Sequence, residues 1–166
     1  MDKKGNAEDI IFAAIILFSI GIGFFIVDYM INVSVDQLLA NPQINSSAGT
    51  VTAFEGMKTT ALRMDYVVFG LFIALFLGLI ITAWFIGGHP IFMFIYFLVT
   101  VMGVVLSTIL ANTWEYITQN VTVFGTTIQD FTITNNIILN LPIYIAIMGF
   151  IGMIVMFTAS SMKGEQ

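Results

Sequence analysis

The sequence predicts an all-α membrane protein with four transmembrane helices. Each of four long apolar runs has about the 20 residues that a helix needs to cross a hydrocarbon core of about 30 Å. Only 9% of the 166 residues are charged, against about 25% in soluble domains. So little polar surface could not cover a soluble globule, and the length allows a single membrane domain, residues 1–166. The runs are Ile10–Val27, Val67–Ile86, Ile91–Ala111 and Ile137–Ala159.

The first span is expected at residues 10–31, after a short polar tail. Its apolar stretch is longer than that of a secretory signal, so we interpret it as a retained span. The polar segment 33–65 follows. Within it, Asn41-Pro42 ends any short helix that begins near Val35, because the residue before proline is pushed out of the α region.

The second span, 66–86, is expected to be the end of a longer helix that begins near Thr52. Apolar residues recur at three- and four-residue spacing through this stretch, as a helix requires. They are Phe54, Met57, Ala61, Met64 and Val68. The first turns, 52–64, are amphipathic. They either extend the helix over a loop, which is the commoner arrangement, or lie on the membrane surface.

The second and third spans, 66–86 and 91–112, are expected to form a tight antiparallel hairpin, because only Gly87-Gly88-His89-Pro90 joins them. Both carry small residues four apart, which let membrane helices approach closely. The stripes are Gly70, Ala74 and Gly78, then Gly103, Ser107 and Ala111; shorter sets are Ser19 with Gly23, and Ala146 with Gly149 and Gly152. These stripes predict a tight bundle, although some could mark contacts with other copies of the chain.

The loop between the third and fourth spans, 114–136, is rich in threonine and β-branched residues. This composition predicts a short extended or β-like loop. The fourth span is expected at 138–160, with its true start near Leu141 because Pro142 is tolerated only near the beginning of a helix.

Four crossings place both termini on one side of the membrane and the segments 33–65 and 114–136 on the other, which we call the loop side. Three lysines on the terminal side, against Lys58 and Arg63 on the loop side, predict cytoplasmic or interior termini. Aromatic residues gather near the loop-side interface, as in an aromatic belt. They are Tyr29, Tyr66, Trp114, Tyr116 and Tyr144.

No ionisable residue lies near the predicted middle of a span, which disfavours a pump or an ion-coupled transporter. Asp28, Asp65 and Glu115 all fall at loop-side ends of spans. Together they could bind a cation or relay protons, but carboxylates at an interface are usually only hydrated. We therefore assign them no binding role.

Other chemistry is equally unsupported by the residue pattern. The single His89 and the absence of cysteine indicate no metal site, and no nucleophile–base pair suggests catalysis. With five basic residues and a net charge of −5, the chain does not suit nucleic acid. We expect no catalytic, cofactor-binding or metal-binding residue, and no enzyme activity.

Two segments resemble small multi-span proteins of tailless icosahedral viruses and phages that enclose an internal lipid membrane. One is His89-Pro90-Ile91-Phe92. The other is Ile133-Thr134-Asn135-Asn136-Ile137, followed by Asn140-Leu141-Pro142. The similarity runs from about residue 66 to 156. It implies a structural protein of the virion membrane, and it brings no active residues.

The leading functional hypothesis is therefore a structural membrane protein of a virion, which contacts copies of itself and capsid or other membrane proteins through its two long loops. Such a protein would lie in the virion internal membrane or the host cell membrane. An accessory subunit of a membrane enzyme complex is the alternative. A holin or pore-former is less favoured, because the third span offers only Thr100, Ser107 and Thr108 as polar lining.

Overall fold

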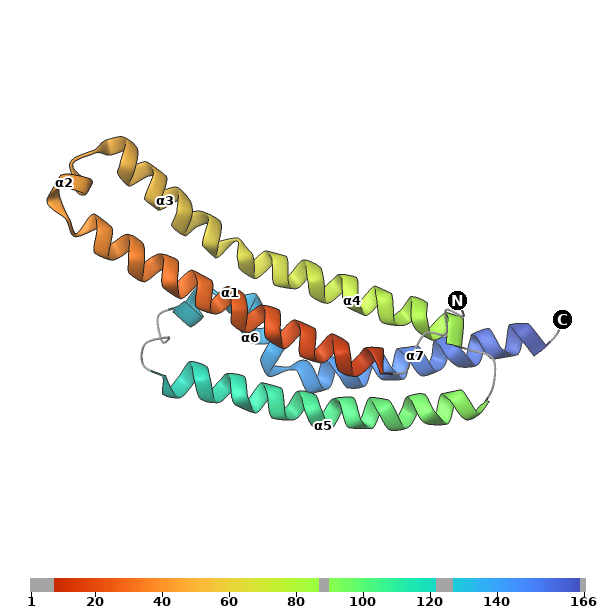
Figure 1. The fold of residues 1–166 in the computed structure, drawn as a ribbon. Helices are drawn as coiled ribbons and strands as arrows, with labels where there is room; N and C mark the ends of the chain where they lie inside the picture. Colours follow the sequence, from red (N-terminus) through yellow and green to blue (C-terminus); the bar gives the residue numbers. More distant parts are fainter. Residues whose placement is uncertain (1–7, 87–89, 122–126, 165–166) are drawn as a thin grey trace.

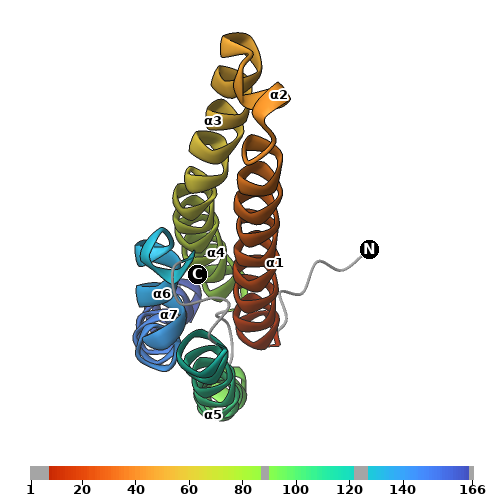
Figure 2. The same ribbon diagram turned by 90° about the vertical axis from the view of Figure 1, so that its left-hand side faces the viewer.

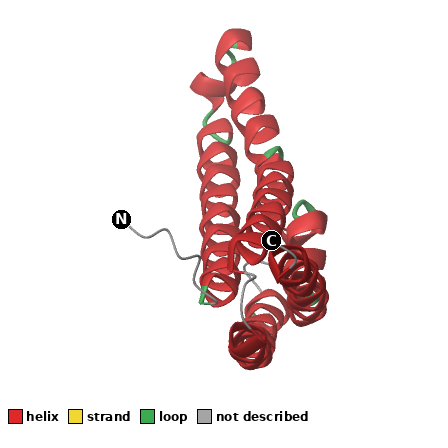
Figure 3. Ribbon diagram, turned by 90° about the vertical axis from the view of Figure 1, so that its right-hand side faces the viewer, coloured by secondary structure: helices red, strands yellow, loops and turns green. Residues whose placement is uncertain are grey.

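The computed structural model describes residues 8–86, 90–121 and 127–164, and every described element is helical (Figures 1 and 3). The elements are α1 (Asp9–Leu39), α2 (Pro42–Asn45), α3 (Ala48–Leu62), α4 (Met64–Ile86), α5 (Pro90–Asn120), η2 (Thr127–Gln129), α6 (Thr132–Leu139) and α7 (Leu141–Gly164). Among the described residues, four helices are long and apolar enough to cross a membrane. The all-α prediction is thus confirmed, and the chain is an integral membrane protein.

Two of the helices are longer than the predicted spans. α1 and α5 each have 31 residues, or about 46 Å of helix against a hydrocarbon core of about 30 Å. α1 continues through the polar residues after position 31 until Asn41-Pro42, which is the first strong breaker. The helix predicted from Thr52 begins at Ala48 and is interrupted only at Arg63, so α3 and α4 run on as one 39-residue stretch.

The upper part of α1, α2 and α3 together form a helical hairpin that extends beyond the loop-side end of α5 (Figure 1). We call residues 33–62 the projecting hairpin. α3 packs against α1 along its length, which agrees with a helical extension rather than a helix lying on the membrane surface. α1 begins and α7 ends at the opposite end of the bundle, so both ends of the described chain lie at that end (Figure 1).

The tight hairpin predicted for the second and third spans is not confirmed, because α4 and α5 do not pack closely within the described residues. Around the bundle, α1 contacts α4 and α5, and α7 contacts both α4 and α5, so that α4 and α5 face each other only across the diagonal (Figure 2). The linking residues 87–89 lie outside the described part of the chain. α5 packs on α7 instead, and this is the most extensive contact in the structure.

Glycine explains this choice of partner. Thr100 of α5 lies directly against Gly149 of α7, and the Tyr96 hydroxyl lies against Gly152, where any β-carbon would clash. Gly103 of α5 lies between α1 and α7, because a β-carbon there would come within 3.1 Å of Ile10 and 3.3 Å of Ile145. These stripes let helices meet closely, as predicted.

The stripe on α4 does not take part in this packing. Gly70, Ala74 and Gly78 are exposed on the outer surface of the bundle, and a β-carbon at either glycine would meet nothing within 4 Å. The small-residue stripe of α4 therefore lies on the outward face of this helix, and the helices of the bundle pack together without using it.

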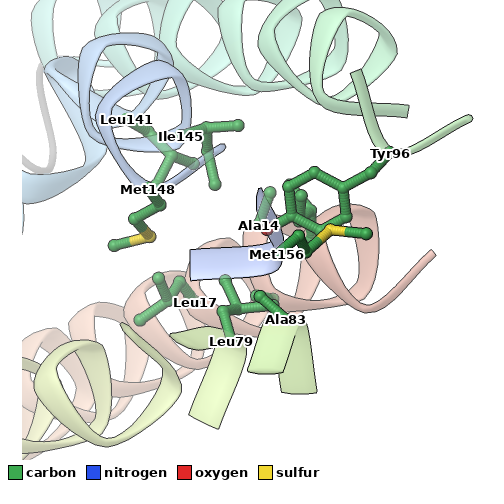
Figure 4. Close-up of a cluster of buried hydrophobic side chains, with 11 residues drawn as sticks. Ala14, Leu17, Leu79, Ala83, Tyr96, Leu141, Ile145, Met148 and Met156 are labelled. Carbon is green, nitrogen blue, oxygen red and sulfur yellow. The ribbon is translucent and has the colours of Figure 1, made fainter. Parts of the chain in front are cut away.

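Two apolar cores follow one another along the bundle. The larger contains Leu17 of α1 beside Leu79 and Ala83 of α4, and Met156 of α7 against the ring of Tyr96 (Figure 4). The smaller, on the loop side, is mostly aromatic. Its buried members are Phe25, Trp114, Phe131 and Ile138.

Most of the described part of the loop predicted to be extended is helical, and only Val121, Asp130 and Phe131 are not. α5 continues to Asn120, η2 covers residues 127–129 and α6 covers residues 132–139, while residues 122–126 lie outside the described part. β-Branched residues disfavour helix only weakly, and tertiary contacts can override that preference. α7 begins at Leu141 with Pro142 in its first turn, as the sequence indicated, and residues 138–139 belong to α6 rather than to the fourth span.

Candidate functional site

Asp65, in the first turn of α4, anchors the N-terminus of α6. Its two carboxylate oxygens accept hydrogen bonds from the backbone amides of Ile133 (2.9 Å) and Thr134 (2.6 Å). A helix start leaves such amides unpaired, and they attract negative charge. α6 has Phe131 at its N-cap position, whose side chain accepts no hydrogen bond. A carboxylate 68 residues away in sequence therefore supplies the cap that the local sequence lacks.

The opposite side of α6 is fixed by Trp114 of α5. The indole Nε1 of Trp114 donates a hydrogen bond to the side-chain oxygen of Asn135 at 2.9 Å. The same ring packs edge-on against Phe25 of α1, which in turn meets Phe131 edge-on, with ring centroids 5.3 and 6.0 Å apart. Edge-to-face aromatic pairs contribute more stability than the burial of their apolar area alone. Directional contacts therefore join α1, α5 and α6 here.

Asp28 is buried on α1, three residues after Phe25 towards the loop side. Its side chain is fully enclosed, and one oxygen accepts a hydrogen bond from the Asn32 amide at 3.0 Å. The other oxygen, Oδ1, has no hydrogen-bond partner within the described residues. The charged side chains that act on it are Asp130, which repels it, and Lys58, but Lys58 is ion-paired with Asp36. Asp28 is therefore a buried carboxylate with only one donor.

The structure separates the three carboxylates that the sequence grouped at the loop-side ends of spans. Asp28 and Asp65 are buried, so the expectation of simple hydration is wrong for both. η2 packs against α1, which carries Asp28, and α6 packs against α4, which carries Asp65. Glu115 is exposed and accepts a hydrogen bond from Gln119, as a hydrated residue would. The described residues contain no group of three or more acidic, histidine or cysteine side chains that could hold a metal ion. His89 lies outside the described range.

The predicted aromatic belt is only partly present. Tyr66 and Tyr116 are exposed at the loop-side ends of α4 and α5, as belt residues are. Trp114 is fully buried, because α6 covers it. Tyr144 is partly buried against Phe72, and its hydroxyl donates to Asn136. Trp114 is therefore a member of the loop-side core, and Tyr144 packs against the larger core.

Sequence reasoning missed α6 and the residues that hold it, above all Asn135 and the amides of Ile133 and Thr134. A usable signal was present. Two asparagines at 135 and 136 interrupt an apolar stretch, and polar side chains in apolar surroundings usually find hydrogen-bond partners. Their partners, Trp114 and Tyr144, had been assigned to the membrane interface.

An open apolar groove lies between α1 and α3, at the base of the projecting hairpin. The groove has a volume of about 440 Å³, and its lining residues are Ile31, Ala53, Gly56, Met57, Thr60, Ala61 and Met64. On the hairpin's flank, the Lys58 ammonium pairs with Asp36. Arg63 is exposed next to the lining residue Met64, at the junction of α3 and α4, and has no ion pair within the described residues. The loop side thus combines a rigid layer around α6 with a hairpin whose surface is free to meet another molecule.

No protein-family model, no curated protein and no solved structure matches the chain.

Proposed function

We propose that the chain is a structural protein of a membrane-containing particle, and that it holds a protein neighbour on its loop side. The observation that carries the proposal is the projecting hairpin. α1 and the α3–α4 helix, at about 46 and 58 Å, exceed what is needed to cross a hydrocarbon core of about 30 Å. The excess length lies on one side and ends in an exposed surface (Figure 1).

The loop-side core supports the same role. A scaffold needs its contact surface held in fixed relation to the membrane. Asp65, Trp114 and the phenylalanine pair tie α6 to three of the four spanning helices, which braces the base of the hairpin. Long-range hydrogen bonds to charged groups and aromatic packing suit rigidity rather than movement.

The polar residues of the third span fit this role better than that of a pore. Thr100 and Ser107 are buried, and Thr100 packs against the α7 backbone at Gly149. Their hydroxyls donate to backbone carbonyls of their own helix. The virion membrane as the setting rests on the sequence resemblance of residues 66–156 and is part of the proposal.

The test is the composition of the native particle that contains the protein. We expect a fixed stoichiometry between this chain and a capsid or other structural protein, measured by quantitative mass spectrometry after mild solubilisation. Stoichiometric recovery with a redox or energy-converting complex would instead identify an accessory subunit. Recovery as an isolated monomer without any protein neighbour would contradict the structural role.

A further inference from the structure

The groove between α1 and α3 extends beyond the reach of lipid tails. Tyr66 of α4 and Tyr116 of α5 are exposed at the same loop-side level, as interfacial tyrosines are, so the hydrocarbon boundary lies near the lower end of the groove at Met64. From Met64 to Ala53 the helix rises by about 16 Å. The headgroup layer on one side of a bilayer is about 5–7 Å thick. Most of the groove therefore lies at the level of water or of another protein, and lipid cannot be its main occupant.

A second copy of the chain in the same membrane also fits poorly. Copies related by rotation about the membrane normal keep every residue at the same height. Arg63 follows Thr60 by three residues and Gly56 by seven, so all three share one face of the helix. Two copies meeting on this face would bring Arg63 towards Arg63. Like charges placed together in an interface oppose association.

The groove has the properties of a helix-binding surface. Its walls are apolar and include Met57, which is 53% exposed, and Met64. Methionine is unbranched and polarisable, and it is common on surfaces that adapt to a bound helix. Gly56 has open space above it, since a β-carbon there would meet nothing within 4 Å. A partner backbone can therefore approach α3 closely.

We infer that this groove binds an amphipathic helix of a neighbouring protein, which presents apolar side chains to Ile31, Met57 and Met64 and an acidic side chain to Arg63 at its membrane-proximal end. Helices bind such grooves through apolar residues at three- and four-residue spacing. The acidic group supplies the partner that Arg63 lacks among the described residues. This inference rests on the proposed function, because it names the kind of neighbour that the scaffold would hold.

The test places a photoreactive benzophenone amino acid at Met57 in the protein's native membranes. After illumination, the adduct is isolated and the crosslinked peptide is sequenced. We expect one protein of the same particle, joined through an amphipathic segment that contains an acidic residue. Gly56→Trp, which fills the groove, should reduce the adduct about tenfold or more, and Arg63→Glu should reduce it similarly, whereas Arg63→Lys should largely retain it.

The matched control is Gly78→Trp. Gly78 also has open space around its α-carbon, but it lies on the outward face of α4 within the spanning segment, so the Met57 adduct should be unchanged. An adduct with a second copy, an adduct with lipid, or no adduct would each overturn the inference. So would an adduct that Gly56→Trp leaves intact.

A second crosslinking position separates this inference from the proposed function. Gln129 is exposed on η2, outside the groove. A protein neighbour crosslinked at Gln129 but absent at Met57 would leave the structural role standing and refute the groove. If neither position captures a protein of the particle, both proposals fail.

Discussion

The half of the bundle next to the chain termini and the half next to α6 are held together in different ways. In the terminal half, Gly149 and Gly152 of α7 let the side chains of Thr100 and Tyr96 reach the α7 backbone, and aliphatic side chains fill the remaining space. In the loop-side half, large aromatic rings and side-chain hydrogen bonds, accepted by Asp65 and donated by Trp114, join α6 to the spanning helices. Close packing can hold helices side by side in lipid, but a short helix outside the spans needs directional partners.

The two buried aspartates show the same contrast at the scale of single residues. Both are almost completely enclosed. Asp65 accepts hydrogen bonds from two backbone amides, so the partial positive charge at the start of α6 balances its negative charge. Asp28 has a single amide donor and a like-charged neighbour, Asp130. An identical substitution at the two sites should therefore have opposite effects.

The largest effect is expected for Asp65→Asn. The amide side chain has only one acceptor oxygen, so one buried backbone amide of α6 loses its partner and the charge at the helix start disappears. We predict a loss of about 3 kcal/mol in the free energy of unfolding. Hydrogen exchange of residues 132–139 should also increase. Glu115→Gln removes an exposed carboxylate nearby and should change neither measurement.

The next largest effect is expected from a pair of glycine substitutions. One lies in the buried small-residue stripe of α7, and the other lies in the outward stripe of α4. Gly149→Ala places a methyl group against Thr100, and overpacking of this kind costs about 2 kcal/mol. Gly70→Ala meets nothing within 4 Å and should be neutral or slightly stabilising. Unfolding in mixed micelles measures both. Equal effects at the two positions would show that the assignment of inner and outer faces is wrong.

A smaller effect of opposite sign is expected for Asp28→Asn. The amide retains an acceptor for Asn32 and removes a buried charge that has one donor. We predict stabilisation by about 1 kcal/mol, since neutral replacement of a poorly compensated buried charge is often favourable. Thermal unfolding of the Asp28→Asn and Asp65→Asn variants, measured side by side, compares the two effects directly. Destabilisation as large as that at Asp65 would indicate a partner for Oδ1 outside the described residues.

The smallest effect is expected for Lys58→Ala. Its ion pair with Asp36 lies on the surface of the projecting hairpin, where the two side chains are 30% and 68% exposed. Exposed pairs contribute about 0.5 kcal/mol or less. The unfolding free energy should barely change, and the small difference should vanish at high salt. A loss above about 1 kcal/mol would mean that the hairpin depends on this pair.

Much of the fold follows from the order of residues along the chain. The four spans, the long helix that ends at Ile86, the start of α7 at Leu141 and the common side of the termini depend on local hydropathy, helical spacing and proline. These are properties of neighbouring residues, so a single sequence carries them.

The choice of neighbours in space could not be predicted in the same way. The stripes on α4 and α7 look alike in sequence, and only the presence of Thr100 and Tyr96 opposite Gly149 and Gly152 makes the α7 stripe an interface. The role of Asp65 depends on a helix 68 residues away. Trp114 was assigned to the membrane interface because α6, which buries it, was not foreseen.

The account depends most on the projecting hairpin standing outside the bilayer, on the side opposite the termini. The chain has no cysteine, so single-cysteine variants can be labelled with a membrane-impermeant maleimide in sealed, oriented vesicles. We predict that cysteines at Gln43 and Met57 react from one side, that a cysteine at Ser161 reacts only from the other, and that one at Gly70 reacts from neither. Labelling of Gly70 together with protection of Met57 would contradict the account.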